Sequence, residues 1–207
     1  MKNNFSQRHI EWNYPKPGNS WDKFVGPGAT KGEQALMLLP TLVLTAGLLI
    51  WVPIQGIQWS IWQYLVAGFL AFDLIGGVIT NATSTAKRWY HRAGQSRGKH
   101  LQFVAVHILQ LFLVTWLFND LNWVYLFSIY AYLMLSSWWV LRLPLYLQRP
   151  AAFGIYTLTL MLHYSFLSGM EGFGAIPGLE WFVPVFFFKL LISHLLTEEP
   201  YRPVSRF

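Results

Sequence analysis

Long apolar stretches alternate with short polar connections along most of the chain after residue 33. Each stretch is close to the length of about 20 residues that an α-helix needs to cross the hydrocarbon core of a bilayer. No Asp, Glu, Lys or Arg occurs between Glu33 and Asp73, which leaves room for two such helices joined by a tight turn. The pattern predicts an all-α, multi-pass integral membrane protein, a bundle of six transmembrane helices. The predicted spans are 34–52, 59–83, 100–118, 123–141, 151–170 and 178–197.

The composition agrees with a membrane protein and excludes several other classes. Hydrophobic residues make up 54% of the 207 residues and charged residues only 12%, whereas soluble domains carry roughly a quarter charged residues. The chain has no cysteine, which excludes disulfides, thiolate metal sites and cysteine nucleophiles. Its net charge of +6 is concentrated in particular loops, so we expect no nucleic-acid partner.

The basic residues predict the orientation of the bundle. The most basic connection is 85–99, and placing it in the cytosol also places residues 1–33, the 142–149 turn and the carboxyl tail there. The opposite connections and their edges carry only Asp120, Glu171 and Glu180. The positive-inside rule therefore predicts that both termini are cytosolic. Because no cleavable signal peptide or organellar targeting feature is evident, we expect a bacterial-type cytoplasmic (inner) membrane.

This topology divides the chain into three parts. Residues 1–33 form a cytosolic segment rich in aromatic residues, Pro and Gly, residues 34–198 the six-helix membrane domain, and residues 199–207 a cytosolic tail. The first part has two interpretations, an irregular cap with its aromatic rings at headgroup level or a loosely ordered tail.

A stripe of polar and small residues runs down the cytosolic end of the second predicted span. Its positions recur at the spacing that keeps side chains on one face of a helix. Within this span, Gly68, Gly76 and Gly77 are expected to allow close helix packing. The stripe indicates where a site lies but not its reaction. It comprises Asp73, Gly77, Thr80, Asn81, Ser84, Lys87, Arg88 and His91.

Ionisable residues inside spans are costly and are functional candidates by default. At about 1.5 Å of rise per residue, Asp73, His107 and His194 share the cytosolic half of the membrane, whereas His163 lies nearer the middle or outer half. His100 and His107 are seven residues apart and point to one face. His194 and Glu198 are four apart, so the carboxylate is expected to orient the imidazole.

Together these residues predict a polar pocket that opens to the cytosol and acts on a lipid, isoprenoid or other amphiphilic substrate. An Asp with several histidines provides acid–base catalysis or holds a metal that activates water. Zinc or iron is therefore a candidate cofactor without being required, and its ligands would be His107, His194 and Asp73. The basic rim suits a phosphate or carboxylate and the anionic lipids of the cytosolic leaflet. The predicted catalytic residues are Asp73, His107, His194, Glu198 and Asn81, and the predicted substrate-binding residues are Lys87, Arg88, His91, Arg92, His100 and Thr80.

Other interpretations remain open at this stage. Asp73 and Lys189 could simply neutralise each other inside the bundle. A small transporter or channel would use Asp73, Lys189 and His163 as an ion or proton relay. A non-catalytic assembly or scaffold protein would bind a larger complex through its aromatic amino-terminal segment.

Overall fold

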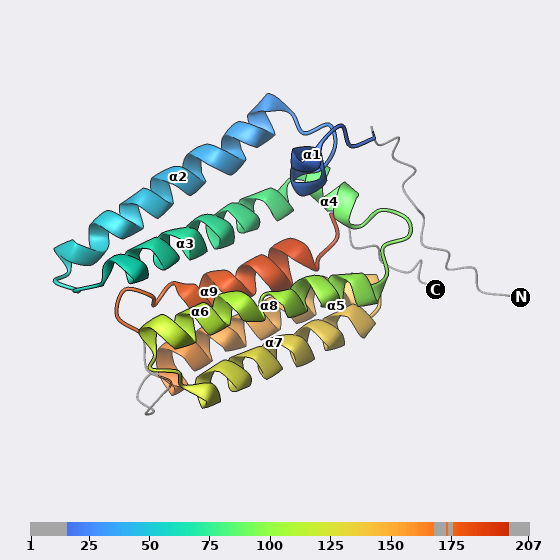
Figure 1. Cartoon of the computed structure of the whole chain (residues 1–207). Helices are drawn as coiled ribbons and strands as arrows, with labels where there is room; N and C mark the ends of the chain where they lie inside the picture. Colours follow the sequence, from blue (N-terminus) through green and yellow to red (C-terminus); the bar gives the residue numbers. More distant parts are fainter. Residues whose placement is uncertain (1–15, 168–172, 174–175, 199–207) are drawn as a thin grey trace, which may run out of the picture.

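The computed structural model describes residues 16–167, 173 and 176–198, and all regular structure in this part of the chain is helical (Figure 1). Two segments are π-helices, labelled η, and each continues directly from an α-helix. The elements are α1 Ser20–Val25, α2 Lys31–Ile54, α3 Ile61–Ala82, α4 Ser84–Tyr90, α5 Arg97–Val106, α6 Ile108–Phe118, α7 Trp123–Arg142, α8 Leu145–Met161, η1 Leu162–Phe166, α9 Phe182–Phe187 and η2 Phe188–His194.

In the part of the chain that the structure describes, four helices are long and apolar enough to cross a membrane: α2, α3, the α5–α6 pair and α7. They match the first four predicted spans closely. At the fifth predicted span, helix α8 begins at Leu145 and runs through Pro150 instead of starting after it. Pro150 lies inside this helix, where it removes one intrahelical hydrogen bond and crowds the carbonyl of Tyr146. At the sixth, α9 and η2 form a shorter apolar helix, Phe182–His194.

Capping residues fix where two of the long helices begin. Thr30 caps α2 and Ser60 caps α3, each with a side-chain oxygen that accepts from the backbone three residues later. In turn, the side-chain oxygens of Glu33 and Gln63 accept from the backbone N–H of Thr30 and Ser60, which completes a capping box at both helices.

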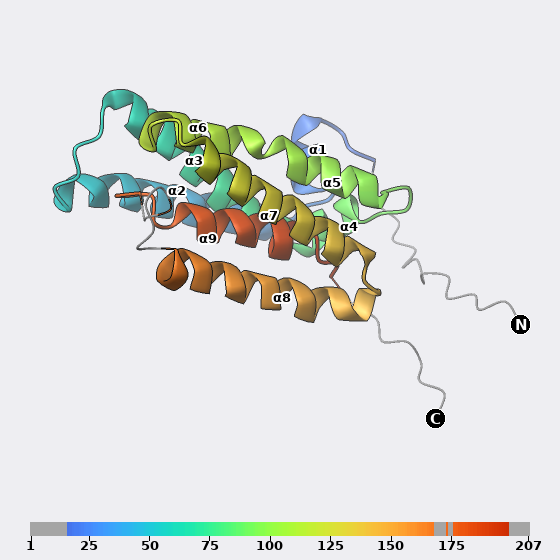
Figure 2. The same cartoon turned by 90° about the horizontal axis from the view of Figure 1, so that it is seen from below.

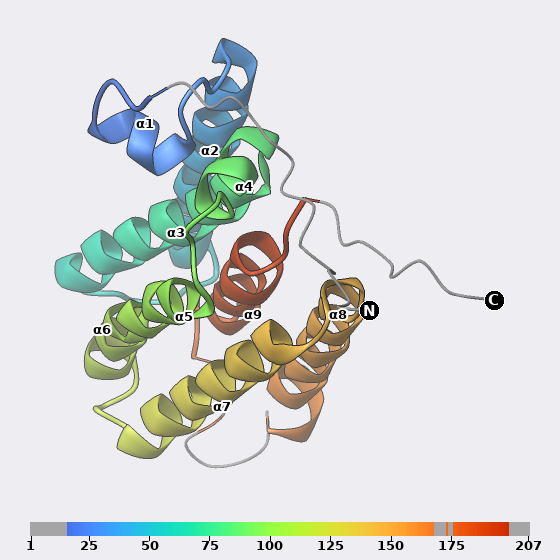
Figure 3. The ribbon, with the colours of Figure 1, turned by 90° about the vertical axis from the view of Figure 1, so that its right-hand side faces the viewer.

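The short helix α9–η2 lies at the centre of the bundle. Figure 3 shows it surrounded by α3, α5, α7 and α8, and α8 runs along it on the side away from α2 (Figures 2 and 3). Phe182, Phe186 and Leu190 on this helix are completely or almost completely buried. Two charged or titratable side chains on η2, Lys189 and His194, are equally enclosed at 3% exposure. The central helix therefore places polar chemistry where it is shielded from solvent.

The glycines of α3 allow neighbouring elements to approach closely, as the sequence predicts. A Cβ added at Gly77 would lie 2.3 Å from Cε of Lys189, so only glycine leaves room for this lysine to cross α3. At Gly68 and Gly76 an added Cβ would lie 3.2 Å from Leu49 and 3.3 Å from Thr41, both on α2. Small residues thus bring α2, α3 and η2 together.

Helix α1 docks on α4. The indole Nε1 of Trp89 donates to the carbonyl of Lys23 at 3.0 Å, and the hydroxyl of Tyr90 donates to the carbonyl of Phe24 at 2.9 Å. Gly26 has a φ of +92°, and a Cβ there would lie 2.6 Å from the carbonyl oxygen of Thr85. The predicted segments 1–15 and 199–207 lie outside the described residues, as does Glu171.

Candidate functional site

Three histidines from separate parts of the chain meet at one end of the bundle. His91 follows α4, His100 lies in the first turn of α5, and His194 ends η2. The rings of His91 and His100 are stacked with their centroids 4.5 Å apart, and Nδ1 of His100 lies 3.3 Å from Nε2 of His194. Nε2 of His91 donates to the carbonyl oxygen of His194 at 2.8 Å. We call His91, His100 and His194 the imidazole cluster.

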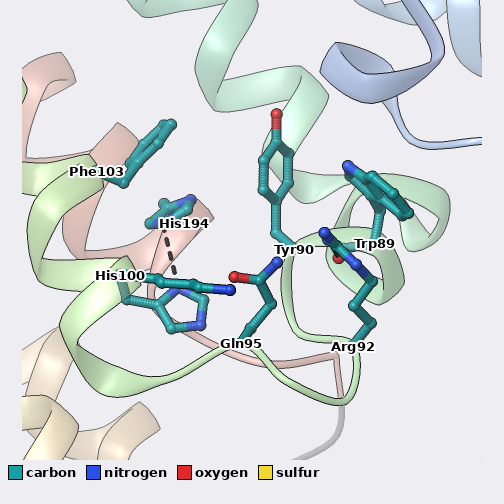
Figure 4. Close-up of a pocket in the computed structure, with 8 residues that line it drawn as sticks. Trp89, Tyr90, Arg92, Gln95, His100, Phe103 and His194 are labelled. Atoms are coloured by element: carbon teal, nitrogen blue, oxygen red, sulfur yellow. Dashed lines mark hydrogen bonds between the residues drawn. The ribbon is translucent and has the colours of Figure 1, made fainter. Parts of the chain in front are cut away.

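The innermost imidazole, His194, has one ring nitrogen without a partner. The Phe103 ring stacks on the His194 ring with centroids 3.7 Å apart, and the Tyr90 ring contacts the His194 ring edge-on (Figure 4). Nδ1 of His194 is buried and has no hydrogen-bond partner within the described part of the chain. Such an atom costs free energy unless a ligand or water supplies the missing bond.

A cavity of about 220 Å³ opens beside the imidazole cluster. Its walls combine imidazole and aromatic rings with two cationic side chains and one amide. This volume suits a headgroup-sized molecule but not an acyl chain. The lining residues are Trp89, Tyr90, Arg92, Gln95, Lys99, His100, Phe103 and His194 (Figure 4), and we call this space the histidine cavity.

Burial keeps the outermost histidine neutral. Burial, together with the smaller effects of the neighbouring His100 and Lys87 side chains, lowers the pKa of His91 to about 3. Because His91 donates through Nε2, its Nδ1 carries the lone pair in the neutral ring. The imidazole at this end of the cluster is therefore a proton acceptor at neutral pH.

Lys87 holds the end of the central helix in place. Its ammonium donates to the backbone carbonyls of Ser193 and Leu196 and lies 3.5 Å from that of Ile192. These carbonyls are at the carboxyl end of η2, where a cation complements the helix dipole. Burial, and next the nearby Arg149 guanidinium, lowers the pKa of Lys87 to about 7, against a smaller opposing effect of Glu198. The ammonium of Lys87, which the sequence predicts to bind substrate, thus contacts backbone carbonyls of the protein itself.

The expected pairing of Glu198 with His194 is wrong. One oxygen of Glu198 accepts from the hydroxyl of Ser84, and the other lies 3.1 Å from Nε of Arg88. The four-residue spacing would align Glu198 with His194 only if the helix continued, but η2 ends at His194. The carboxylate instead ties the segment after η2 to α4, and this bond also engages Arg88.

Among the predicted cations of the rim, Arg92 lines the histidine cavity. Its guanidinium lies 3.5 Å from the centroid of the Trp89 ring and donates to the carbonyl of Trp89. The cavity contains a second cation, Lys99, whose Nζ lies 3.2 Å from the carbonyl oxygen of Gly94. Lys99 belongs to the basic connection that the sequence identifies, but nothing in its spacing distinguishes it as a site residue.

Asp73 lies apart from the imidazole cluster. Its Oδ2 accepts from Nζ of Lys189 at 2.8 Å and from Nε2 of Gln110 at 3.2 Å. His107 lies near enough to interact electrostatically with Asp73 and Lys189, while its Nδ1 donates to the carbonyl of Phe103 at 2.7 Å. We call Asp73, Gln110 and Lys189 the Asp73 cluster.

One phenylalanine separates these two sites. Phe103 stacks on His194, and its centroid is 4.8 Å from that of His107. The predicted metal ligands His107, His194 and Asp73 are therefore divided between two environments. Among residues 16–167, 173 and 176–198, no group of three His, Asp or Glu side chains has metal-binding geometry.

The other predicted residues lie outside the cavity. Thr80 and Asn81 are buried near the end of α3 and do not line it. His163 lies on η1, where its Nε2 donates to the carbonyl of Glu180 at 3.0 Å. The polar stripe is thus divided among the Asp73 cluster, the core of α3 and the contacts of α4.

Sequence reasoning missed the aromatic walls of the cavity and the π-helical form of η2. Trp89, Tyr90 and Phe103 look like ordinary interfacial or core aromatics, because their role depends on packing between α4 and α5. Both π-helical segments carry histidines, and π-helical turns are frequent at functional sites. No periodicity in the sequence distinguishes a π-helix from an α-helix.

Comparisons with protein-family models, with curated proteins and with solved structures find no match. The chemistry and geometry of the site are therefore what indicate its function.

Proposed function

We propose that the chain crosses the membrane six times, with both termini and α4 on the cytosolic side. The four long apolar helices support membrane insertion, and α8–η1 and the shorter α9–η2 would be the remaining two spans. The basic 85–99 connection, α1 and the α7–α8 turn gather at one end of the bundle (Figure 1), as the positive-inside rule requires of a cytosolic face. Anionic lipids of a bacterial-type inner membrane would meet this face.

On this topology, the protein is a membrane-embedded enzyme that acts on an amphiphile presented from the cytosolic leaflet. The observation that carries this proposal is the buried imidazole pair of His100 and His194 beside the histidine cavity. Catalytic bases need a partner that fixes their orientation and an environment that keeps them unprotonated, and this pair has both. A buried histidine with an unpaired nitrogen has little structural value.

The residues around the cavity take complementary roles in this enzyme. His194 is the general base, and the bond to His100 holds its ring in place. Arg92 and Lys99 attract an anionic headgroup to the opening, because they are the cations that line the cavity. Lys87 positions His194 indirectly by fixing the last carbonyls of η2. Lipid, isoprenoid and related amphiphiles remain the substrate class, with the apolar tail outside the cavity.

The geometry favours an enzyme over the alternative proton relay. That relay would run through Asp73, Lys189 and His163 and needs hydrogen-bonding groups in sequence. Lys189 donates to Asp73, but no hydrogen bond among the described residues joins His163 to either of them. His163 bonds to a carbonyl at the opposite end of the bundle.

The experiment compares lipid turnover by the wild-type protein and by two histidine variants. The protein is reconstituted into vesicles of bacterial total lipid extract, and the lipids are followed over time by untargeted mass spectrometry. We expect the wild type to convert at least one lipid class, and His194→Gln to lose this conversion. His163→Gln is the matched control and should retain activity. Unchanged lipids with the wild type, or full turnover by His194→Gln, would refute the proposal.

A further inference from the structure

The Asp73 cluster has the features of a second ligand site, at mid-depth of the bundle and away from the histidine cavity. Asp73 lies near the middle of α3, and Gln110 lies in the first turn of α6. Both donors to Asp73, from Lys189 and Gln110, reach the same oxygen, Oδ2. The Lys189 side chain reaches Asp73 by passing over Gly77, where an added Cβ would overlap the lysine.

Two acceptor oxygens of this cluster lack donors. Oε1 of Gln110 is buried without a hydrogen-bond partner in the described part of the chain. Oδ1 of Asp73 likewise receives no hydrogen bond from the residues that the structure describes. A buried acceptor without a donor, such as Oε1 of Gln110, costs free energy that a donated hydrogen bond would recover. A ligand for this cluster must therefore donate hydrogen bonds.

The cluster opens toward the outside of the bundle. The Asp73 side chain is 27% exposed, whereas that of Lys189 is 4% exposed. Helices α3 and α6 lie side by side on one outer face (Figure 3). Phe69, one turn before Asp73, and Leu109, next to Gln110, are both exposed on these helices. In a membrane this face is in contact with lipid, where water is absent.

Both helices that bring partners to Asp73 are irregular near the cluster. The α5–α6 helix is interrupted at His107, one turn before Gln110. Lys189 lies in the π-helical segment η2. Interrupted helices within a membrane are tolerated where they line a site, and they commonly mark binding positions near the midplane.

The charge of the cluster selects a neutral ligand. The Asp73 carboxylate and the Lys189 ammonium cancel, so a cation or an anion would add a net charge in a medium of low dielectric constant. A hydroxyl group donates one hydrogen bond and carries no charge. We propose that the Asp73 cluster binds the hydroxyl group of a neutral long-chain alcohol that approaches from the bilayer between α3 and α6, with its chain along Phe69 and Leu109. This site goes beyond the proposed headgroup chemistry of the histidine cavity.

The test measures binding of radiolabelled hexadecanol to the full-length protein in phosphatidylcholine nanodiscs, with empty nanodiscs subtracted. Hexadecyl methyl ether is the matched competitor, because it has the same chain but cannot donate a hydrogen bond. We expect saturable binding of the alcohol and competition by the ether that is about tenfold weaker than by unlabelled alcohol. Equal competition by the ether, or no saturable binding, would overturn the proposal.

Two variants keep the test specific. Gln110→Met removes the unpaired acceptor at nearly constant volume and should weaken alcohol binding by about tenfold. Gln63→Met is the matched control. Gln63 donates to the carbonyl of Leu117 in the same α3–α6 contact, but its Oε1 already accepts from the backbone N–H of Ser60. Both variants are first checked for monodispersity and helical circular dichroism, and the competition by the ether against the wild-type protein decides the test if Gln110→Met does not fold. Undiminished binding by the cluster variant would refute the site. His194→Gln should bind the alcohol normally, so failure of the cavity proposal is measured separately.

Discussion

The ion pair between Asp73 and Lys189 allows a quantitative test of how the bundle tolerates charge. The perturbations are Asp73→Asn, Lys189→Met and the two together. In the wild type, Nζ of Lys189 lies 2.8 Å from Oδ2 of Asp73, and the lysine side chain is only 4% exposed. Each single substitution leaves one charge without its partner, whereas the double variant leaves none.

The expected magnitudes follow from the burial of each partner. Removing Asp73 strands an ammonium in the core, which we expect to cost about 3–5 kcal/mol in the free energy of unfolding. Removing Lys189 strands a carboxylate that keeps the Gln110 bond and is 27% exposed, so its cost should be smaller, about 2–3 kcal/mol. The double variant should lie within about 1 kcal/mol of the wild type, because replacing a whole buried pair is often neutral.

Reversible unfolding in bicelles, followed by steric trapping or by detergent titration, gives the four free energies of this cycle. The Arg88–Glu198 pair is the matched control, because its side chains are 31% and 33% exposed at a similar separation of 3.1 Å. Its coupling should be only about 0.2–1 kcal/mol. If the Asp73 and Lys189 substitutions are additive, the two charges do not stabilise each other and the ligand site built on them loses its basis.

Three further predictions concern acid stability, orientation and helix packing. Because burial lowers the pKa of His91 to about 3 from its ordinary 6.5, the unfolded chain takes up a proton that the folded protein excludes. Stability should therefore fall as pH drops from 6.5 toward 3, by up to about 1.4 kcal/mol per pH unit, and a pH series of unfolding free energies should show this dependence reduced in His91→Gln. The chain has no cysteine, so the single variants Ala93→Cys and Gln58→Cys can each be labelled with a membrane-impermeant maleimide. In intact cells only the Gln58→Cys variant should react. Labelling of the Ala93→Cys variant alone would show that the topology is inverted. Gly77→Ala would place a Cβ 2.3 Å from Cε of Lys189, and thermal unfolding should show a loss of about 1–3 kcal/mol, whereas Gly154→Ala, with open space around it, should not destabilise.

The sequence predicts much of the helical framework because span length and apolar composition depend on neighbouring residues alone. Gly77 and the neutralisation of Asp73 by Lys189 are also accessible from sequence, since a buried charge needs a partner and few are available. The start of α8 is not, because Pro150 looks like a boundary although the helix continues through it. The Glu198 interpretation fails for a related reason, since spacing predicts a contact only where the helix continues.

The imidazole cluster could not be assembled from spacing or depth. Depth estimates place Asp73, His107 and His194 together, but depth does not reveal that the Phe103 ring stands between His194 and the other two. His91 joins the cluster only because the chain after α4 folds back over the end of η2, where its Nε2 reaches the His194 carbonyl.

The basic residues of helix α4 make many of their contacts within the protein. One side of α4 holds α1 through Trp89 and Tyr90, and the other holds the end of η2 through Lys87 and Arg88. The same two aromatic residues line the histidine cavity. Helix α4 therefore has two roles. Lys87 and Arg88 hold the end of the central helix, and Trp89 and Tyr90 shape the cavity beside His194. Arg92 and Lys99 lie in the wall of the cavity, and each also donates to a backbone carbonyl. In the proposed enzyme these two cations would meet the anionic headgroup.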